Sequence, residues 1–321
     1  MVAGGIIATV PAVLFLAVDN IYFMCLMKTI YSVGYAILQV VAVSFLTEVY
    51  PSEETRASIM GYFNASVSAF GVIMSTVAGY MSMVSMEFAY RAYLIFIPIT
   101  ILFVFALPKI KPEAAQSVDT VRETGEKGRL SVDFWFMIIT FTVFSVALEM
   151  VYYFLSTYIV ENEIGDAVYI GNTNSIRIAA CFFIALVFGT MLKKIGKSLI
   201  IICYTLATIS FAVLATVPSG TVVRIFYTLL GMSFTIAYVY VYTMAPVIAG
   251  RGKQSDAIAI LAAMFSAACF LNTYCAGWIE KLFNTTRFTP VLWVCTAMGV
   301  ICIVASVFSV IRTEKSETEV Q

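Results

Sequence analysis

Four charged residues of this 321-residue chain, Lys28, Glu149, Arg177 and Arg224, stand inside long apolar segments. If such a segment crosses a membrane, each charge inside it costs at least about 2.5–3.5 kcal/mol, so each marks a candidate site for a solute or an ion. Arg177 lies roughly 15 Å deep at a rise of ~1.5 Å per residue, and Lys28 lies roughly 10 Å deep. Arg224 is close to a segment end, from which its side chain can reach water. Lys28, Glu149 and Arg177 are therefore the candidates for substrate binding and ion coupling.

Glu149 and Arg177 belong to successive segments that a short connection joins, so we expect the two side chains to lie at similar depth. Two interpretations stay open. In the first, Arg177 pairs with Glu149 when the site is empty and with substrate, or an anion bound by Lys28, when it is loaded. Protonation of Glu149 then releases the arginine and couples a proton to the solute. In the second, a fixed ion pair only holds two helices together.

Uncharged polar residues at helical spacing are candidates for lining the same site. Tyr31, Tyr35 and Gln39 follow one another at four-residue intervals and therefore share one face of a helix. The remaining candidates for contact with a solute are Asn64, Ser68, Tyr238, Tyr242 and Asn272. For the tyrosines, packing in the protein core is an equal alternative.

Several classes of function are excluded by residues that the sequence lacks. The chain has no His, and its seven Cys lie in apolar segments without a C-x-x-C pair, so the common zinc sites cannot form. No phosphate-binding loop and no catalytic constellation are present. The net charge is zero, which gives no support for a nucleic-acid partner. We therefore predict no enzyme activity, no cofactor and no metal site.

Composition and segment length predict an all-α polytopic membrane protein. Hydrophobic residues make up 61% of the chain and charged residues only 12%, about half the share that is typical of soluble domains. A helix needs ~20 apolar residues to cross a bilayer. Ten apolar segments are long enough or nearly so: 3–18, 21–47, 57–82, 90–107, 132–159, 167–191, 197–217, 221–248, 255–280 and 289–311.

The distribution of Lys and Arg predicts how these segments are oriented. If the N-terminus faces the cytoplasm, thirteen basic residues fall in inner loops and the tail and four fall at the outer side. Cytoplasmic loops of membrane proteins are enriched in Lys and Arg. We therefore expect both termini in the cytoplasm, in a multi-pass protein of the plasma membrane.

A polar stretch at 108–131 divides the chain unequally. It contains Pro, Gly and mixed charge and is predicted to be a cytoplasmic linker. Four segments precede it in an N-terminal bundle, 1–107, and six follow in a C-terminal bundle, 132–312, with a cytoplasmic tail at 313–321.

The two parts share a pattern of small residues. When the chain is shifted by 198 positions, "TRASIMGYFNASVSAFGVIMSTVAGYM" lies over "KQSDAIAILAAMFSAACFLNTYCAGWI". Gly79 and Gly277 then correspond, and we expect both to let neighbouring helices approach closely. The matched pattern indicates two parallel halves, as in many transporters.

The stretch "FLTEVYPSEETRASIMGYFNASVSAFGVIMSTVAGYM" resembles the fourth helix, inner loop and fifth helix of the major facilitator superfamily. "SMEFAYRAYLIFIPI" resembles the entry into the sixth helix of that family, and "FGTMLKKIGKSLIII" resembles its basic Gly-rich loop. The resemblance covers essentially the whole chain. It implies a fold of two helical bundles, of which the first lacks two helices in this chain, so that about ten (4 + 6) remain.

The same resemblance implies which polar residues contribute to gating. Loops of this kind carry charge contacts between helices that hold one state of the transporter. The candidates on the cytoplasmic side are Glu48, Arg56, Lys193, Lys194 and Lys197. For Glu48 and Arg56 a merely solvated turn is an equal alternative.

The function that these features favour is secondary active transport of a small solute by alternating access. The expected partners are a small-molecule substrate, the lipid bilayer and protons or another coupling ion. An organic anion with proton symport is the specific expectation, because Arg177 and Glu149 are deep in the segments. The alternative is a transporter-like membrane protein that does not transport: a truncated remnant or a ligand sensor.

Overall fold

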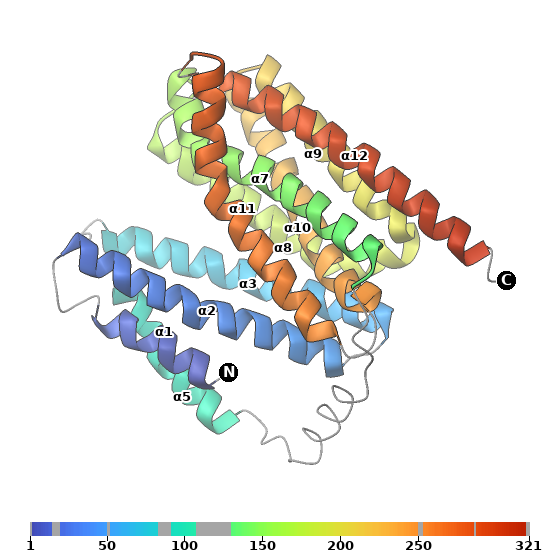
Figure 1. The fold of residues 1–321 in the computed structure, drawn as a ribbon. Helices are drawn as coiled ribbons and strands as arrows, with labels where there is room; N and C mark the ends of the chain where they lie inside the picture. Colours follow the sequence, from blue (N-terminus) through green and yellow to red (C-terminus); the bar gives the residue numbers. More distant parts are fainter. Residues whose placement is uncertain are drawn as a thin grey trace.

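The computed structural model describes residues 2–14, 20–49, 52–82, 91–106, 130–249, 253–285 and 287–318. These residues form ten α-helices and two short 3-10 helices. The expected all-α membrane fold is confirmed. Figure 1 shows two groups of helices, one drawn in blue to cyan and the other in green to red.

The first group is built from helices before residue 107. Its elements are α1 (Val2–Leu14), α2 (Ile21–Val49), α3 (Glu53–Ser82), η1 (Arg91–Ile95) and α5 (Phe96–Ala106). Helices α1 and α2 cross closely at glycines, because a Cβ on Gly34 would lie 2.5 Å from the backbone nitrogen of Ala8. Thr9 and Thr100 share a hydrogen bond of 2.8 Å, which joins α1 to α5.

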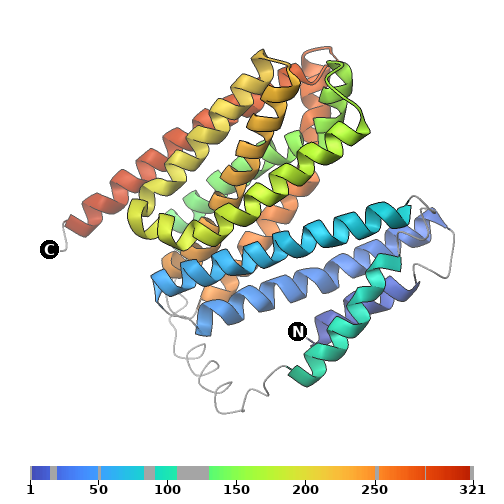
Figure 2. The same ribbon diagram turned by 180° about the vertical axis from the view of Figure 1, so that it is seen from behind.

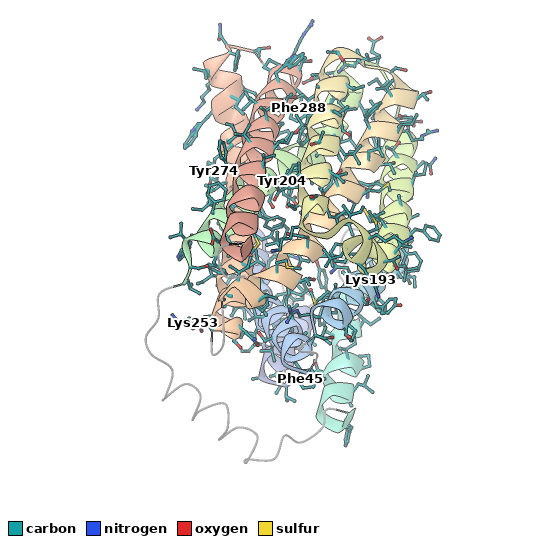
Figure 3. The ribbon with its side chains drawn as sticks, turned by 90° about the vertical axis from the view of Figure 1, so that its right-hand side faces the viewer. Phe45, Lys193, Tyr204, Lys253, Tyr274 and Phe288 are labelled. Atoms are coloured by element: carbon teal, nitrogen blue, oxygen red, sulfur yellow. The ribbon has the colours of Figure 1, made fainter. Side chains whose placement is uncertain are left out.

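The second group contains six long helices. They are α7 (Val132–Glu161), α8 (Ala167–Ile195), α9 (Leu199–Thr216), α10 (Gly220–Ala249), α11 (Gln254–Leu282) and α12 (Thr289–Thr318), with the 3-10 turn η2 (Gly196–Ser198) between α8 and α9. Ser131 and Asp166 cap the first turns of α7 and α8 with their side chains. Gly196 ends α8 at a φ of +67°, which favours glycine. Tyr204 of α9 is 1% exposed and packs against Phe144, with 4.7 Å between ring centroids (Figure 3).

The helices agree closely with the ten apolar segments predicted from sequence. By length and composition, seven ranges of the described residues can cross a membrane, and one of them, Tyr169–Thr216, covers α9 and all but the first two residues of α8. Two shorter apolar helices, Val2–Leu14 and Tyr93–Leu102, add to these. Most of the linker at 108–131 lies outside the described residues, and the domain boundaries stay a prediction.

The two groups meet mainly where α3 packs along α8. A Cβ on Gly61 of α3 would lie 2.5 Å from the carbonyl oxygen of Ala185 in α8. A Cβ on Gly189 of α8 would overlap Ser58 Oγ and lie 2.9 Å from Ser58 Cα. Figure 2 shows α3 and α8 side by side and nearest each other at the end where α8 leads into α9. Helix α2 also contacts α11, and α10 contacts α3.

These contacts correct two sequence-based predictions about glycine. A Cβ on Gly277 would have no neighbour within 4 Å, so this glycine does not serve a close helix contact. The surroundings of Gly79 lie outside the described residues. Gly189 does not belong to a loop: α8 continues to Ile195, and the predicted basic loop is reduced to η2 and the last turn of α8.

Many serine and threonine hydroxyl groups inside the second group bond to their own helix. Each donates to the carbonyl oxygen four residues earlier, at 2.7–3.1 Å: Thr140, Thr142, Ser145, Thr205, Thr208, Ser210, Thr228, Thr235, Thr243 and Thr296. This bond satisfies a hydroxyl without a partner on another helix.

Candidate functional site

Arg177 of α8 is held by a side chain one turn earlier in its own helix. Its Nε and Nη2 donate to Asn174 Oδ1 at 3.1 and 2.9 Å. Its guanidinium carbon lies 4.4 Å from the ring centroid of Tyr152 in α7 and 5.4 Å from that of Tyr227 in α10. Three helices therefore fix the cation in one place by hydrogen bonds and by contact with aromatic faces.

A glycine of α10 makes room for the arginine. A Cβ on Gly231 would overlap Arg177 Cγ and lie 3.0 Å from Cδ and 3.1 Å from Cys181 Sγ. The overlap is with the stem of the side chain rather than with its mobile end. Gly231 is therefore required for the observed position of the guanidinium.

Glu149 lies one helical turn before Tyr152 and is 9% exposed. Its carboxylate is within electrostatic reach of Arg177. Both residues are among those that the structure describes, and neither a hydrogen bond nor an ion pair within 4.0 Å joins them. The direct ion pair between Arg177 and Glu149 that the sequence suggested is therefore absent from this structure, and Arg177 bonds to Asn174 instead. Glu149 remains a nearby charge at longer range.

Four aromatic rings continue from the arginine into the centre of the molecule. Tyr152 contacts Phe234 edge to face, with 6.2 Å between centroids. Phe234 in turn lies 5.7 Å from both Tyr238 and Phe265, which are themselves 5.7 Å apart. We call Tyr152, Phe234, Tyr238 and Phe265 the aromatic row. It carries side chains from α7, α10 and α11.

The aromatic row also connects the two groups of helices. Gln39 of α2 donates from Nε2 to the Tyr238 hydroxyl at 2.8 Å, and Tyr238 packs on Tyr242 with 4.4 Å between centroids. Tyr35 lies within electrostatic reach of Tyr238 and Tyr242. The structure thus brings two candidates of α2, Tyr35 and Gln39, next to a candidate of α10, Tyr238.

Lys28 and Tyr31 form a separate cluster in the first group. Lys28 Nζ donates to the Tyr93 hydroxyl at 2.6 Å and lies 4.9 Å from the Tyr31 ring centroid. Tyr31 also packs edge to face on Tyr93 and Phe96. None of these contacts involves the residues around Arg177, so Lys28 is not part of that site in this structure.

The two candidate asparagines bond within their own helices. Asn64 Nδ2 donates to the Met60 carbonyl at 3.1 Å. Asn272 is fully buried, and its Nδ2 donates to the Cys269 carbonyl at 2.5 Å. Neither contact is with another helix.

The basic gating candidates gather at one end of the second group. Lys193 and Lys194 occupy the last turn of α8, and Lys197 lies in η2. In Figure 3 Lys193 and Lys253 lie on the side of the first group, far from Phe288. Arg56 of α3 is 4% exposed. The Glu48 side chain lies outside the described residues, so its contact with Arg56 stays a prediction.

Four residues of the site were missed by sequence reasoning: Tyr152, Asn174, Tyr227 and Gly231. Spacing offered a signal for two of them, because Asn174 and Tyr152 stand three residues from Arg177 and Glu149, on the same helix faces. Tyr227 and Gly231 come from a third helix, and only the packing of α10 against α8 reveals them.

A family model matches most of the chain, and solved structures share its fold. The model of the Major Facilitator Superfamily matches residues 1–273. The human organic anion transporter MFSD10 (TETRAN) is similar in structure at 11% sequence identity, with a TM-score of 0.77 over 95% of this chain and 76% of that one. The fucose:proton symporter FucP of E. coli gives 14% identity and a TM-score of 0.71 over 96% of this chain and 82% of that one. No curated protein matches the chain.

Proposed function

Because this chain belongs to the Major Facilitator Superfamily and is a multi-pass membrane protein of a transporter fold, we propose that it is a secondary transporter of a small organic anion, driven by protons. The observation that carries the proposal is the environment of Arg177. The guanidinium is fixed by Asn174 and by two tyrosine rings, and no carboxylate neutralises it by direct contact among the described residues. A fixed cation of this kind, deep in a membrane protein, is suited to bind the charged group of a solute.

Glu149 supplies the coupling. An ionised carboxylate within reach of Arg177 offsets its positive charge and weakens its attraction for an anion. Protonation of Glu149 removes this offset, so the anion binds more tightly when the proton is bound. Linkage is reciprocal, so the anion also favours binding of the proton. Both then move in the same direction, which is symport.

The contact between the helix groups supports alternating access. The close approach of α3 and α8 at Gly61 and Gly189 lies toward the end that carries Lys193 and Lys197. We assign this end to the cytoplasm, in line with the enrichment of basic residues there. The structure then corresponds to a state whose cytoplasmic ends are packed together, and transport requires them to separate.

The proposal is tested on purified protein in proteoliposomes that contain a pH-sensitive dye. Glucuronate and glucose form a matched pair, since they differ mainly in one carboxylate, and succinate extends the series. We expect an added anion to drive acidification of the lumen, and glucose to have no effect. Arg177→Ala should abolish the anion response, and Arg177→Lys should weaken it because Lys lacks the planar fork.

Glu149→Gln separates coupling from binding. This variant is permanently neutral, so we expect it to exchange anions across the membrane but not to accumulate them in response to a proton gradient. Glucose transport, or anion transport that survives Arg177→Ala, would contradict the proposal. Tight anion binding without flux would indicate the ligand sensor instead.

A further inference from the structure

The aromatic row begins at the arginine and leads away from it, so a solute bound to Arg177 would meet aromatic faces next. Tyr152 is the shared element, because its ring contacts both the guanidinium and Phe234. Tyr152 and Arg177 therefore define where the charged group of a solute lies. Phe234 and Phe265 would contact the uncharged part of the solute.

The rings of the row are not sealed inside the core. Phe234 and Phe265 are only partly buried and pack on the edge of the hydrophobic core, whereas Phe141 behind them is fully buried. Phe141 contacts both Phe265 and Tyr238, at 6.2 and 6.4 Å between centroids. One side of the row is thus backed by the core, and Phe234 and Phe265 keep part of their surface exposed.

Two buried hydroxyl groups at the ends of this region lie beside polar side chains without a well-formed bond to them, Tyr152 Oη beside Arg177 and Tyr242 Oη beside Tyr238. Tyr152 Oη and Tyr242 Oη are buried and make no hydrogen bond of standard geometry to any described residue. A buried hydroxyl without a partner costs free energy, which a ligand oxygen can recover. Tyr152 adds a donor beside Arg177, and Tyr242 adds one beside Tyr238.

We propose that the Arg177 site prefers anions that carry an aromatic ring: the acidic group binds Arg177 and the Tyr152 hydroxyl, and the ring packs against Phe234 and Phe265. This inference rests on the proposed function, because it names the class of anion that the Arg177 site selects. Aromatic rings prefer edge-to-face and offset contacts, which an aliphatic ring of similar area cannot make. The site therefore distinguishes anions with an aromatic ring from anions with an aliphatic ring, in addition to selecting for negative charge.

Three sulfonates test the inference by binding to the purified chain in nanodiscs. Benzenesulfonate has an aromatic body, cyclohexanesulfonate an aliphatic body of similar size, and methanesulfonate almost none; all three stay ionised. Aromatic pairs add about 0.5–1.5 kcal/mol beyond burial, so we expect benzenesulfonate to bind roughly 2–12-fold more tightly than cyclohexanesulfonate. Methanesulfonate should bind least.

Two phenylalanines of α11 provide a matched pair of variants. Phe265→Leu removes a ring of the row, and we expect the preference for benzenesulfonate over cyclohexanesulfonate to fall close to one. Phe270 lies on the same helix and is 65% exposed, so Phe270→Leu should leave the preference unchanged. Phe234→Leu gives a second test of the row from α10, and melting temperature verifies that each variant is folded.

The outcomes separate this inference from the proposed function. If all three sulfonates bind and Arg177→Ala abolishes binding, but the aromatic and aliphatic rings bind equally, the aromatic inference is wrong and the anion site stands. An equal loss of preference in Phe265→Leu and Phe270→Leu also overturns the inference. If no sulfonate binds, or binding is unaffected by Arg177→Ala, the anion site itself is wrong and the inference fails with it.

Discussion

The contact between α3 and α8 gives a prediction that does not depend on the solute. In Gly61→Ala, the new methyl group lies 2.5 Å from the carbonyl oxygen of Ala185. Carbon and oxygen atoms at helix contacts normally lie about 3.3–3.6 Å apart. The two helices must therefore separate locally by roughly 1 Å, since the oxygen belongs to the backbone of α8 and cannot rotate away.

The magnitude follows from the cost of overpacking. One additional methyl group in a close contact costs about 1–3 kcal/mol. For domains of 150–250 residues, 1 kcal/mol lowers the melting temperature by about 2–4 °C. We therefore expect Gly61→Ala to melt several degrees below the unsubstituted protein.

Gly71 is the control on the same helix. A Cβ there has no neighbour within 4 Å, so Gly71→Ala introduces no overlap and gains helix propensity of up to about 1 kcal/mol. Helix α8 offers a second test and control of this kind. A Cβ on Gly189 would overlap Ser58, whereas a Cβ on Gly171 would have no neighbour within 4 Å. The assay is thermal unfolding in detergent, followed by the loss of the monodisperse peak in size-exclusion chromatography.

Two results would refute this reasoning. One is a Gly61→Ala variant that melts like the unsubstituted protein. The other is an equal loss of stability in Gly61→Ala and Gly71→Ala, which would mean that any side chain on this helix is unfavourable and that the contact with Ala185 is irrelevant.

Three further predictions address the site and the topology. Gly231→Ala should weaken binding of benzenesulfonate by about 5–150-fold, because overpacking that costs about 1–3 kcal/mol displaces the stem of the Arg177 side chain. The control Gly171→Ala should leave the affinity for benzenesulfonate unchanged, and titration in nanodiscs measures both. Affinity for the same anion should fall as pH rises and Glu149 ionises, and in Glu149→Gln this pH dependence should be lost; a persisting dependence would assign the coupling proton elsewhere. A cysteine at Ser117 should react with an impermeant maleimide only after cells are opened, and labelling of intact cells would contradict the cytoplasmic linker.

The helices could be predicted from sequence because hydrophobicity and length determine them in a membrane. Each apolar segment corresponds to a helix among the described residues, and α5 is described to Ala106, directly before the predicted linker. The deep charges were also recognisable, since an arginine such as Arg177 is rare in an apolar segment. Hydrophobic segments and the charges inside them are local features of the chain, so a single sequence is enough to predict them.

The partners of those charges could not be predicted in the same way. Glu149 was the expected partner of Arg177, yet Asn174 on the same helix takes the hydrogen bonds at 2.9 and 3.1 Å. The choice depends on the rotamer that Gly231 and the two tyrosine rings permit, and these come from other helices. The prediction that Gly277 allows a close helix contact was wrong for the same reason. Whether a glycine serves such a contact depends on the residues of the neighbouring helix that lie opposite it.

The hydroxyl groups that bond back to their own helix have a consequence for how the protein can evolve. A threonine such as Thr243 is polar in formula, but its single proton is already donated to the carbonyl oxygen of Val239. Exchange for alanine, valine or cysteine removes a bond that the backbone does not need, so such positions can drift between lineages with little effect on specificity. Changes in what the protein recognises would then arise at few positions, those whose side chains contact Arg177 or belong to the aromatic row. Among relatives, variation at Asn174, Tyr152 or Phe265 should therefore signal a new ligand, whereas variation at Thr243 should not.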